Sequence, residues 1–133
     1  MNNLREIKFR GKQHDGSWLY GSLIVYKDGA TAIHRGIRER LFESEYVITK
    51  TVGQFTGQDK NGMEVYDGDI VEFEYIIKHP TPIKYVGVVK RNKYGHSYLH
   101  VEGLEYSEFH IENLKTGEVV GNIHDNKELL KTE

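Results

Sequence analysis

The stretch TVGQFTGQDKNGMEVYDGDIV, residues 51–71, decides how the rest of the chain is interpreted. Two tight-turn dipeptides, Asn61-Gly62 and Asp67-Gly68, divide it into short extended segments. Gly accepts a positive φ, and Asn or Asp tolerates one, so such dipeptides are typical of hairpins. The stretch therefore predicts a hairpin between residues 54–59 and 63–66, followed by a second turn into a long strand at 70–77.

Alternation of apolar and charged residues continues beyond this stretch. Val71, Phe73 and Tyr75 share one face of an extended segment, and Glu72 and Glu74 fall on the other. Similar segments at 18–26, 86–88, 98–101, 109–111 and 119–123 are separated by further turn signals at Asp15-Gly16, Asp28-Gly29, Tyr94-Gly95 and Thr116-Gly117. This spacing predicts a mainly β protein, built as an antiparallel barrel or roll.

Helical signal is confined to two short segments. One or two turns could form at 35–44, and a short capped helix is expected at 125–130. The loop His79-Pro80-Thr81-Pro82 cannot lie inside a central strand. We expect an N-terminal β-rich subdomain at 1–50 and a barrel at 51–133, forming one compact unit. Five aromatic residues are assigned mostly to the core: Trp18, Tyr20, Phe55, Phe73 and Tyr75.

Composition excludes several classes of protein. The 133 residues include no Cys, which excludes disulfide scaffolds, thiol catalysis and thiolate zinc sites. No run of about 18 apolar residues occurs, and the opening residues lack the apolar core of a signal peptide. A cytoplasmic protein without membrane contact is therefore expected. The net charge of −2 and the pI near 6.4 argue against capture of nucleic acid by bulk charge.

Three blocks of sequence carry a resemblance to a known family. They are REIKFRG at 5–11, the stretch at 51–71 with its QFTG, DKNG and YDGDIV segments, and VVGNIHDNKELL at 119–130. Together they closely resemble the YopX family of phage and prophage proteins, in that family's order and over nearly the whole chain. This sequence has His124, Asp125 and Lys127 where the family usually has Tyr, Glu and Pro.

The resemblance implies a phage-encoded or prophage-encoded, mainly β protein whose C-terminal half is an SH3-like barrel. We expect that barrel to pack against an N-terminal antiparallel β piece, with one or two short helices. The family has no settled biochemical role, and small barrels host unrelated functions, so the resemblance implies no activity. Asp67 and Asp69 also have a structural task available, because they can accept backbone hydrogen bonds beside the turn.

Carboxylates between residues 67 and 74 raise the alternative of a divalent-metal enzyme. Asp67, Asp69, Glu72 and Glu74 supply the oxygen ligands that Mg²⁺ or Mn²⁺ uses in phosphoryl transfer or hydrolysis. In a regular strand, however, Asp69 has the parity of Val71, and the two Glu residues face the other way. The alternative therefore rests on Asp67 and Asp69, and a non-catalytic protein without cofactor is the main expectation.

The seven histidines show no metal-binding pattern. No HExxH occurs, and His96 and His100, four residues apart, would be separated by about 13 Å on a strand. We expect them beside turns on the surface, and only an approach of His110 to one of them stays open.

Basic residues next to aromatic residues mark candidate contact surfaces. Charges that contact phosphates, beside rings that stack on bases, are typical of nucleic-acid interfaces. Lys8, Arg10 and Lys12 share a strand face, and further basic residues cluster at 35–40. The residues that we select for a contact surface are Lys84, Lys90, Arg91, Lys93, Tyr94 and Tyr98.

The sequence therefore predicts a non-catalytic binding or assembly protein. Nine Tyr in a mainly β chain can leave strand edges and aromatic patches exposed, which a second copy would cover in a homo-oligomer. The partners left open are a second copy, a phage or host protein, and nucleic acid. The metal-dependent enzyme built on Asp67 and Asp69 stays as the alternative.

Overall fold

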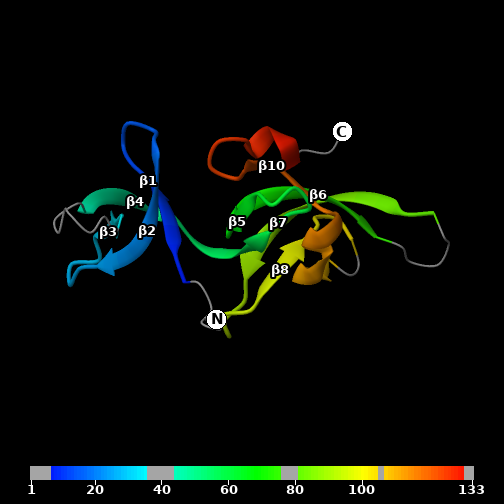
Figure 1. The fold of residues 1–133 in the computed structure, drawn as a ribbon, viewed down its shortest axis with the longest axis horizontal. Helices are drawn as coiled ribbons and strands as arrows, with labels where there is room; N and C mark the ends of the chain where they lie inside the picture. The colour runs from blue at the N-terminus through cyan, green and yellow to red at the C-terminus, as the bar shows by residue number, and fades with distance from the viewer. Residues whose placement is uncertain (1–6, 36–43, 76–80, 105–106, 131–133) are drawn as a thin grey trace. The chain divides into compact units, whose positions relative to one another are not determined.

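The computed structural model describes residues 7–35, 44–75, 81–104 and 107–130. Within these ranges the chain is mainly β, and its strands form two antiparallel sheets (Figure 1). The elements, in chain order, are β1 (Phe9–Lys12), β2 (Trp18–Val25), β3 (Thr31–His34), β4 (Ser44–Gln58), β5 (Glu64–Tyr66), β6 (Asp69–Tyr75), β7 (Ile83–Arg91), β8 (Ser97–His100), β9 (Glu108–His110), the 3₁₀ helix η1 (Ile111–Thr116), β10 (Glu118–Asn122) and the 3₁₀ helix η2 (Lys127–Leu130).

The chain divides into two compact units, Met1–Phe55 and Thr56–Glu133. In the first, the strand pairings close into a ring: β1 pairs with β2, β2 with β3, β3 with β4, and β4 with β1. β2 changes partner at Gly21, where a Cβ would lie 2.1 Å from the His34 carbonyl oxygen. Only Gly permits so close an approach of two backbones. Leu19, Ile33 and Val47 form the buried centre of this small barrel.

A bulge in β4 lets that strand close the ring. Arg10 pairs with Gly53 but Lys12 pairs with Ile48, so two steps along β1 correspond to five along β4. The buried Thr51 fills the resulting gap in the hydrogen-bond ladder. Its hydroxyl accepts from the Lys12 N–H at 2.9 Å and donates to the Ile48 carbonyl at 2.6 Å.

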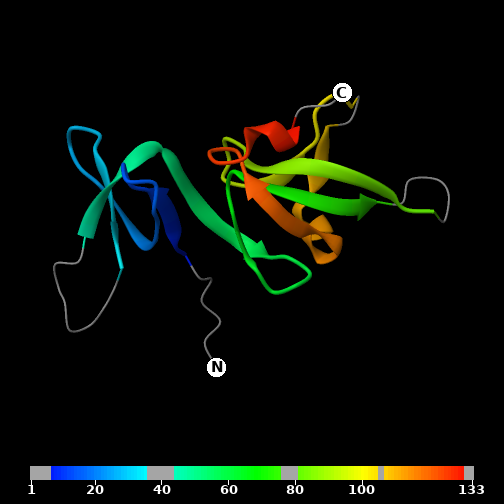
Figure 2. The same cartoon turned by 90° about the horizontal axis from the view of Figure 1, so that it is seen from above.

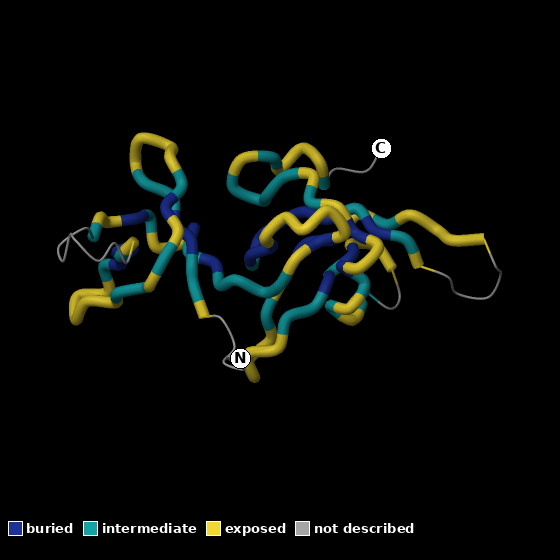
Figure 3. The backbone as a smooth tube through the Cα atoms, viewed as in Figure 1, coloured by how far each residue is buried: buried dark blue, intermediate teal, exposed yellow. Residues whose placement is uncertain are grey.

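The second unit is built on the sheet with strand order β10-β6-β7-β8-β9. β6 and β7 run side by side through six consecutive residue pairs (Figure 2). Buried residues lie within these strands, and the turns are exposed (Figure 3). The core comprises Val65, Val71, Phe73, Val89, Leu99, Val101 and Leu114. A meander followed by a 3₁₀ helix and a last strand on β6 is compatible with an SH3-like barrel, as predicted.

Four hairpins share one turn geometry. In each, the first residue donates its N–H to the carbonyl of the fifth, and the fourth is a Gly with φ between 80° and 92°. This is the type I turn with a glycine bulge, which needs a positive φ at that position. The turns are residues 13–17, 26–30, 59–63 and 92–96, and they confirm the predictions at Asp15-Gly16, Asp28-Gly29, Asn61-Gly62 and Tyr94-Gly95.

Asp59 joins the turn at 59–63 to the last strand. Its buried carboxylate accepts the N–H groups of Asn61 and Met63 on one oxygen and that of Val119 on the other, at 2.8–3.0 Å. Burial raises the pKa of this carboxyl, but the three N–H donors and the charge of Lys60 lower it by more, so its pKa lies below the ordinary value. Asp69, also buried, accepts the Tyr66 N–H at 2.8 Å, as the local-capping prediction requires.

Some sequence-based expectations need correction. Tyr20 and Tyr75 are 47% and 37% exposed and do not lie in the core as assigned. Tyr20 pairs with Arg10 on the outward face of β1 and β2, and Tyr75, near the described end of β6, packs edge-on against Phe109 with ring centroids 5.0 Å apart. Gly117 does not form the hairpin turn that was predicted, because its N–H closes the last turn of η1 on the Leu114 carbonyl at 2.9 Å. It follows η1 at φ −95°, where a Cβ would lie 2.7 Å from Val71.

The helical predictions have mixed outcomes. The short helix expected at 125–130 is confirmed as η2, but Ile111, expected to continue a strand, begins η1. The segment 36–43, where one or two helical turns were expected, lies outside the described residues. Among the described residues, none of the helices has the length and apolar character needed to cross a membrane.

Candidate functional site

Strand β7 carries apolar residues on both of its faces. Tyr85 and Val89 point to the core, whereas Val86 and Val88 alternate with them on the opposite side. Lys84 and Lys90 share the parity of Val86 and Val88, so this outer face has an apolar centre and a cation at each end. Cross-strand pairing of Val88 with His100 and of Lys90 with Tyr98 extends the face onto β8.

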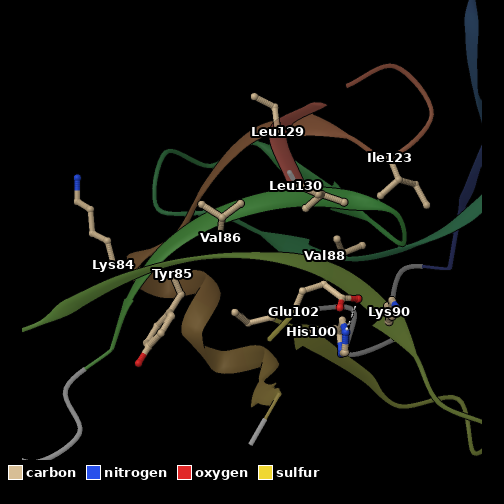
Figure 4. A pocket seen from close by; sticks show the side chains of 11 residues that line it. Lys84, Tyr85, Val86, Val88, Lys90, His100, Glu102, Ile123, Leu129 and Leu130 are labelled. Atoms are coloured by element: carbon tan, nitrogen blue, oxygen red, sulfur yellow. Dashed lines mark hydrogen bonds and ion pairs between the residues drawn. The ribbon is translucent and has the colours of Figure 1, made fainter. Parts of the chain in front are cut away.

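A pocket of about 490 Å³ lies on this outer face (Figure 4). Its size falls in the range of sites that hold a small ligand or the anchoring side chains of a peptide. The sheet supplies Val86 and Val88, and the end of the chain supplies Ile123, Leu129 and Leu130 on the opposite wall. Val86 and Leu129 remain 37% and 42% exposed. The walls therefore offer apolar surface that this chain leaves partly uncovered.

Polar groups lie around this apolar surface. Lys84 Nζ lies 3.5 Å from Glu72 Oε1, an exposed pair that contributes little stability. At the other end, His100 Nε2 and Glu102 Oε1 are 3.1 Å apart, and Lys90 lies on the same side of the pocket (Figure 4). The lining holds two lysines, one histidine and one glutamate, so the pocket is locally basic.

Five of the six predicted contact residues lie at two kinds of position. Lys84 and Lys90 line the pocket, and Tyr98 lies beside Lys90 on the same face. Lys93 and Tyr94 lie on the 92–96 turn, where the Lys93 ammonium is 5.2 Å from the Tyr94 ring centroid.

Arg91 differs from the rest of this set. It forms a forked pair with Asp67 at 3.0 and 3.1 Å and donates to the Gly95 carbonyl at 2.7 Å. Arg91 therefore holds the turn before β6 against the β7–β8 hairpin, which is a structural task.

Asp67 and Asp69, the carboxylates of the proposed metal site, already accept hydrogen bonds from other groups of the protein. Asp67 accepts both arms of the Arg91 fork, and Asp69 accepts the Tyr66 N–H from within the core. Across the described part of the chain, His, Asp and Glu side chains form no group of three placed to hold a metal ion. His110, whose approach to another histidine was left open, pairs with Tyr98, and its Nδ1 accepts the Glu112 N–H.

Comparison with known proteins settles the family. The family model described as YopX protein matches residues 8–131. The chain belongs to the YopX family. A search of curated proteins found no match to this YopX chain. Among solved structures, the crystal structure of protein EF1440 from Enterococcus faecalis is similar, with a TM-score of 0.56 and 24% identity over 95% of this chain and 99% of that one. At that identity the likeness shows the fold alone.

Sequence reasoning missed most of the pocket walls of this YopX protein. Val86 and Val88 were read only as strand residues, and the roles of Ile123, Leu129 and Leu130 depend on where η2 lies relative to β7. One signal was available. Residues 85–89 are apolar on both parities, which is typical of a strand that is covered on both faces.

Proposed function

We propose that this YopX protein is a non-catalytic binding protein whose C-terminal unit captures a peptide segment of a protein partner in the pocket of β7 and η2. The observation that carries the proposal is the combination of partly exposed Val86 and Leu129 with surrounding lysines. An apolar centre with a polar rim is the usual anatomy of a protein interface.

The charges around the pocket favour a bound peptide segment that has an apolar anchor residue next to Asp or Glu. The unit 56–133 holds nine Lys and Arg against fourteen Asp and Glu, a net charge of −5. The pocket lining nevertheless holds Lys84 and Lys90 against Glu102 alone. An acidic flank on the bound segment would meet a locally basic site on a unit whose net charge is negative.

The same charges make a nucleic-acid interface here a weaker candidate. Binding to phosphates requires cations that can replace the counterions of the polyanion. Lys84 pairs with Glu72, Arg91 pairs with Asp67, and Glu102 lines the pocket itself.

Panning a random-peptide display library on the full chain tests the proposal. We expect enrichment of peptides that combine an apolar or aromatic residue with Asp or Glu. Val86→Glu places a charge on the pocket wall. It should lower the affinity for the enriched peptides by about tenfold or more, as loss of a central anchor does. Val25→Glu, at a 65% exposed position of the other unit, is the matched control.

The outcomes separate the candidate partners. Absence of an enriched motif, or equal binding by Val86→Glu, contradicts the proposal. If light scattering shows a dimer that Val86→Glu dissociates, the occupant is a second copy of the chain and not a partner peptide. Far-UV circular dichroism of each variant checks that the sheet content is retained.

A further inference from the structure

The two units of the chain carry net charges of opposite sign. Residues 1–55 hold nine Lys and Arg against six Asp and Glu, a net charge of +3, whereas residues 56–133 carry −5. The whole-chain value of −2 hides this difference. A polyanion would therefore meet its favourable surface on the first unit, not on the unit that holds Lys84 and Lys90.

Three basic residues of the first unit lie beside aromatic rings on one face. Lys8, just before β1, and Arg10 and Lys12 within it have the opposite parity to Phe9, which packs inward against the barrel core. Cross-strand pairing places Tyr20 beside Arg10 and Trp18 beside Lys12 on the same side.

Distances confirm that cations and rings are in contact. The Lys8 ammonium lies 4.7 Å from the centroid of Phe55, and the Arg10 guanidinium lies 4.7 Å from that of Trp18. The Lys12 ammonium lies 5.9 Å from the same Trp18 ring. Lys8 lies just before β1, and the other five residues of this group lie on β1, β2 and β4. We call the group the cation–aromatic face: Lys8, Arg10, Lys12, Trp18, Tyr20 and Phe55.

We propose that the cation–aromatic face binds single-stranded nucleic acid. Lys8 and Lys12 contact phosphates, and the 47% exposed Tyr20 ring stacks on a base. Arg10 is only 6% exposed, so it acts as a positioning residue that orients the Trp18 ring and does not reach the backbone of the ligand. Stacking needs unpaired bases, which favours single strands over duplexes.

Ligand binding at this face can be followed by the fluorescence of Trp18, because it is the sole Trp of the chain. We expect an oligothymidylate of about 15 nucleotides to quench its fluorescence at low salt. The logarithm of the binding constant should fall with the logarithm of salt concentration by about 0.7 for each phosphate contact. Absence of quenching, or binding that is independent of salt, overturns the proposal.

Variants distinguish the contribution of phosphate contacts from that of base stacking. Binding is measured by the fluorescence anisotropy of a labelled oligothymidylate. Lys8→Gln or Lys12→Gln should reduce the salt slope by about 0.7. Tyr20→Ser should lower affinity roughly 5- to 150-fold at an unchanged slope, the range that stacking of one base supplies. Lys27→Gln removes the same charge from the exposed 26–30 turn of the same unit and should leave both quantities nearly unchanged.

Two results would overturn the assignment of the face. If Lys27→Gln costs as much as Lys8→Gln, bulk charge and not this surface attracts the ligand. If inorganic polyphosphate competes equally well against wild type and Tyr20→Ser, ring stacking contributes nothing. Retention of the far-UV spectrum in Tyr20→Ser keeps loss of binding distinct from loss of folding.

Discussion

Within the 51–71 stretch, the Asp59 carboxylate accepts three backbone N–H groups. Asp59→Asn replaces one carboxylate oxygen with an NH₂ group, which cannot accept all three N–H donors of Asn61, Met63 and Val119. We expect a loss of about 1–3 kcal/mol in the free energy of unfolding, measured by urea titration at pH 7. Asp28→Asn, in the exposed 26–30 turn, is the control and should change it by less than about 0.5 kcal/mol.

The same carboxylate should make stability depend on acidity. Because its pKa is lower in the folded chain than in the unfolded one, Asp59 stabilises the protein fully above the unfolded value of about 3.9. That contribution is lost as the pH falls from there through the lower folded pKa. Wild type should therefore lose stability relative to Asp59→Asn on acidification below about pH 4, and parallel curves for the two proteins would contradict this assignment.

Arg91 should act on stability and hardly on partner binding. Its fork on Asp67 and its bond to Gly95 are lost in Arg91→Ala, and Arg91→Lys keeps the charge without the paired geometry. We expect the Ala variant to lower the free energy of unfolding by about 1–3 kcal/mol, with a smaller loss for Lys. A double-mutant cycle with Asp67→Asn measures the coupling. A coupling near zero would show that the pair contributes nothing.

Divalent metal should leave the thermal midpoint unchanged. Asp67 is engaged by Arg91 and Asp69 by the Tyr66 N–H, so a metal ion would have to displace both contacts. A ligand present at a hundred times its dissociation constant stabilises the native state by about 2.7 kcal/mol. A clear rise of the midpoint in millimolar Mg²⁺ or Mn²⁺ would therefore support the metal-dependent alternative over the binding protein proposed above.

At the scale of elements, the β4 bulge depends on one hydroxyl. Thr51→Val preserves shape but leaves the Lys12 N–H without its acceptor, so we expect a loss of about 1–3 kcal/mol in urea unfolding. Thr51→Ser keeps the hydroxyl and should retain most of that stability. If Val and Ser destabilise equally, the methyl group and not the hydrogen bond is what the bulge requires.

The elements also mark where sequence reasoning succeeds. The four hairpin turns were predictable because their cause is local: a Gly at positive φ following Asp, Asn or Tyr. The inward parity of Asp69, Val71 and Phe73 was equally readable from alternation. The prediction that Ile111 continues a strand was wrong, because alternation with Phe109 over three residues cannot distinguish the end of a strand from the start of a 3₁₀ helix.

The candidate site was less predictable because it depends on distant contacts. Lys84 and Lys90 could be chosen from composition. That Arg91 has a different, structural role could be seen only from its pairing with Asp67 in the turn before β6. Leu129 and Leu130 line a pocket only because η2 lies over Val86 and Val88, residues about 40 positions earlier in the chain, and periodicity carries no such long-range information.

At the scale of the whole molecule, the two proposed binding surfaces belong to different units. A substitution in one surface should therefore weaken binding at that surface alone. Val86→Glu should weaken peptide capture and leave the quenching of Trp18 by oligothymidylate intact, whereas Tyr20→Ser should weaken oligothymidylate binding and leave peptide capture intact. Substitutions without shared partners act independently. Parallel measurement of both activities on both variants tests this, and joint loss in a folded variant would show that one surface serves both ligands.

The charge separation between the units also governs how the protein behaves in a column. Near its isoelectric point of about 6.4 the chain is neutral as a whole, but residues 1–55 and 56–133 are each still charged, with opposite sign. Cation-exchange and anion-exchange resins should therefore both retain it at low conductivity, each through a different end of the sequence. A purification planned on the overall titration curve would miss this amphoteric behaviour.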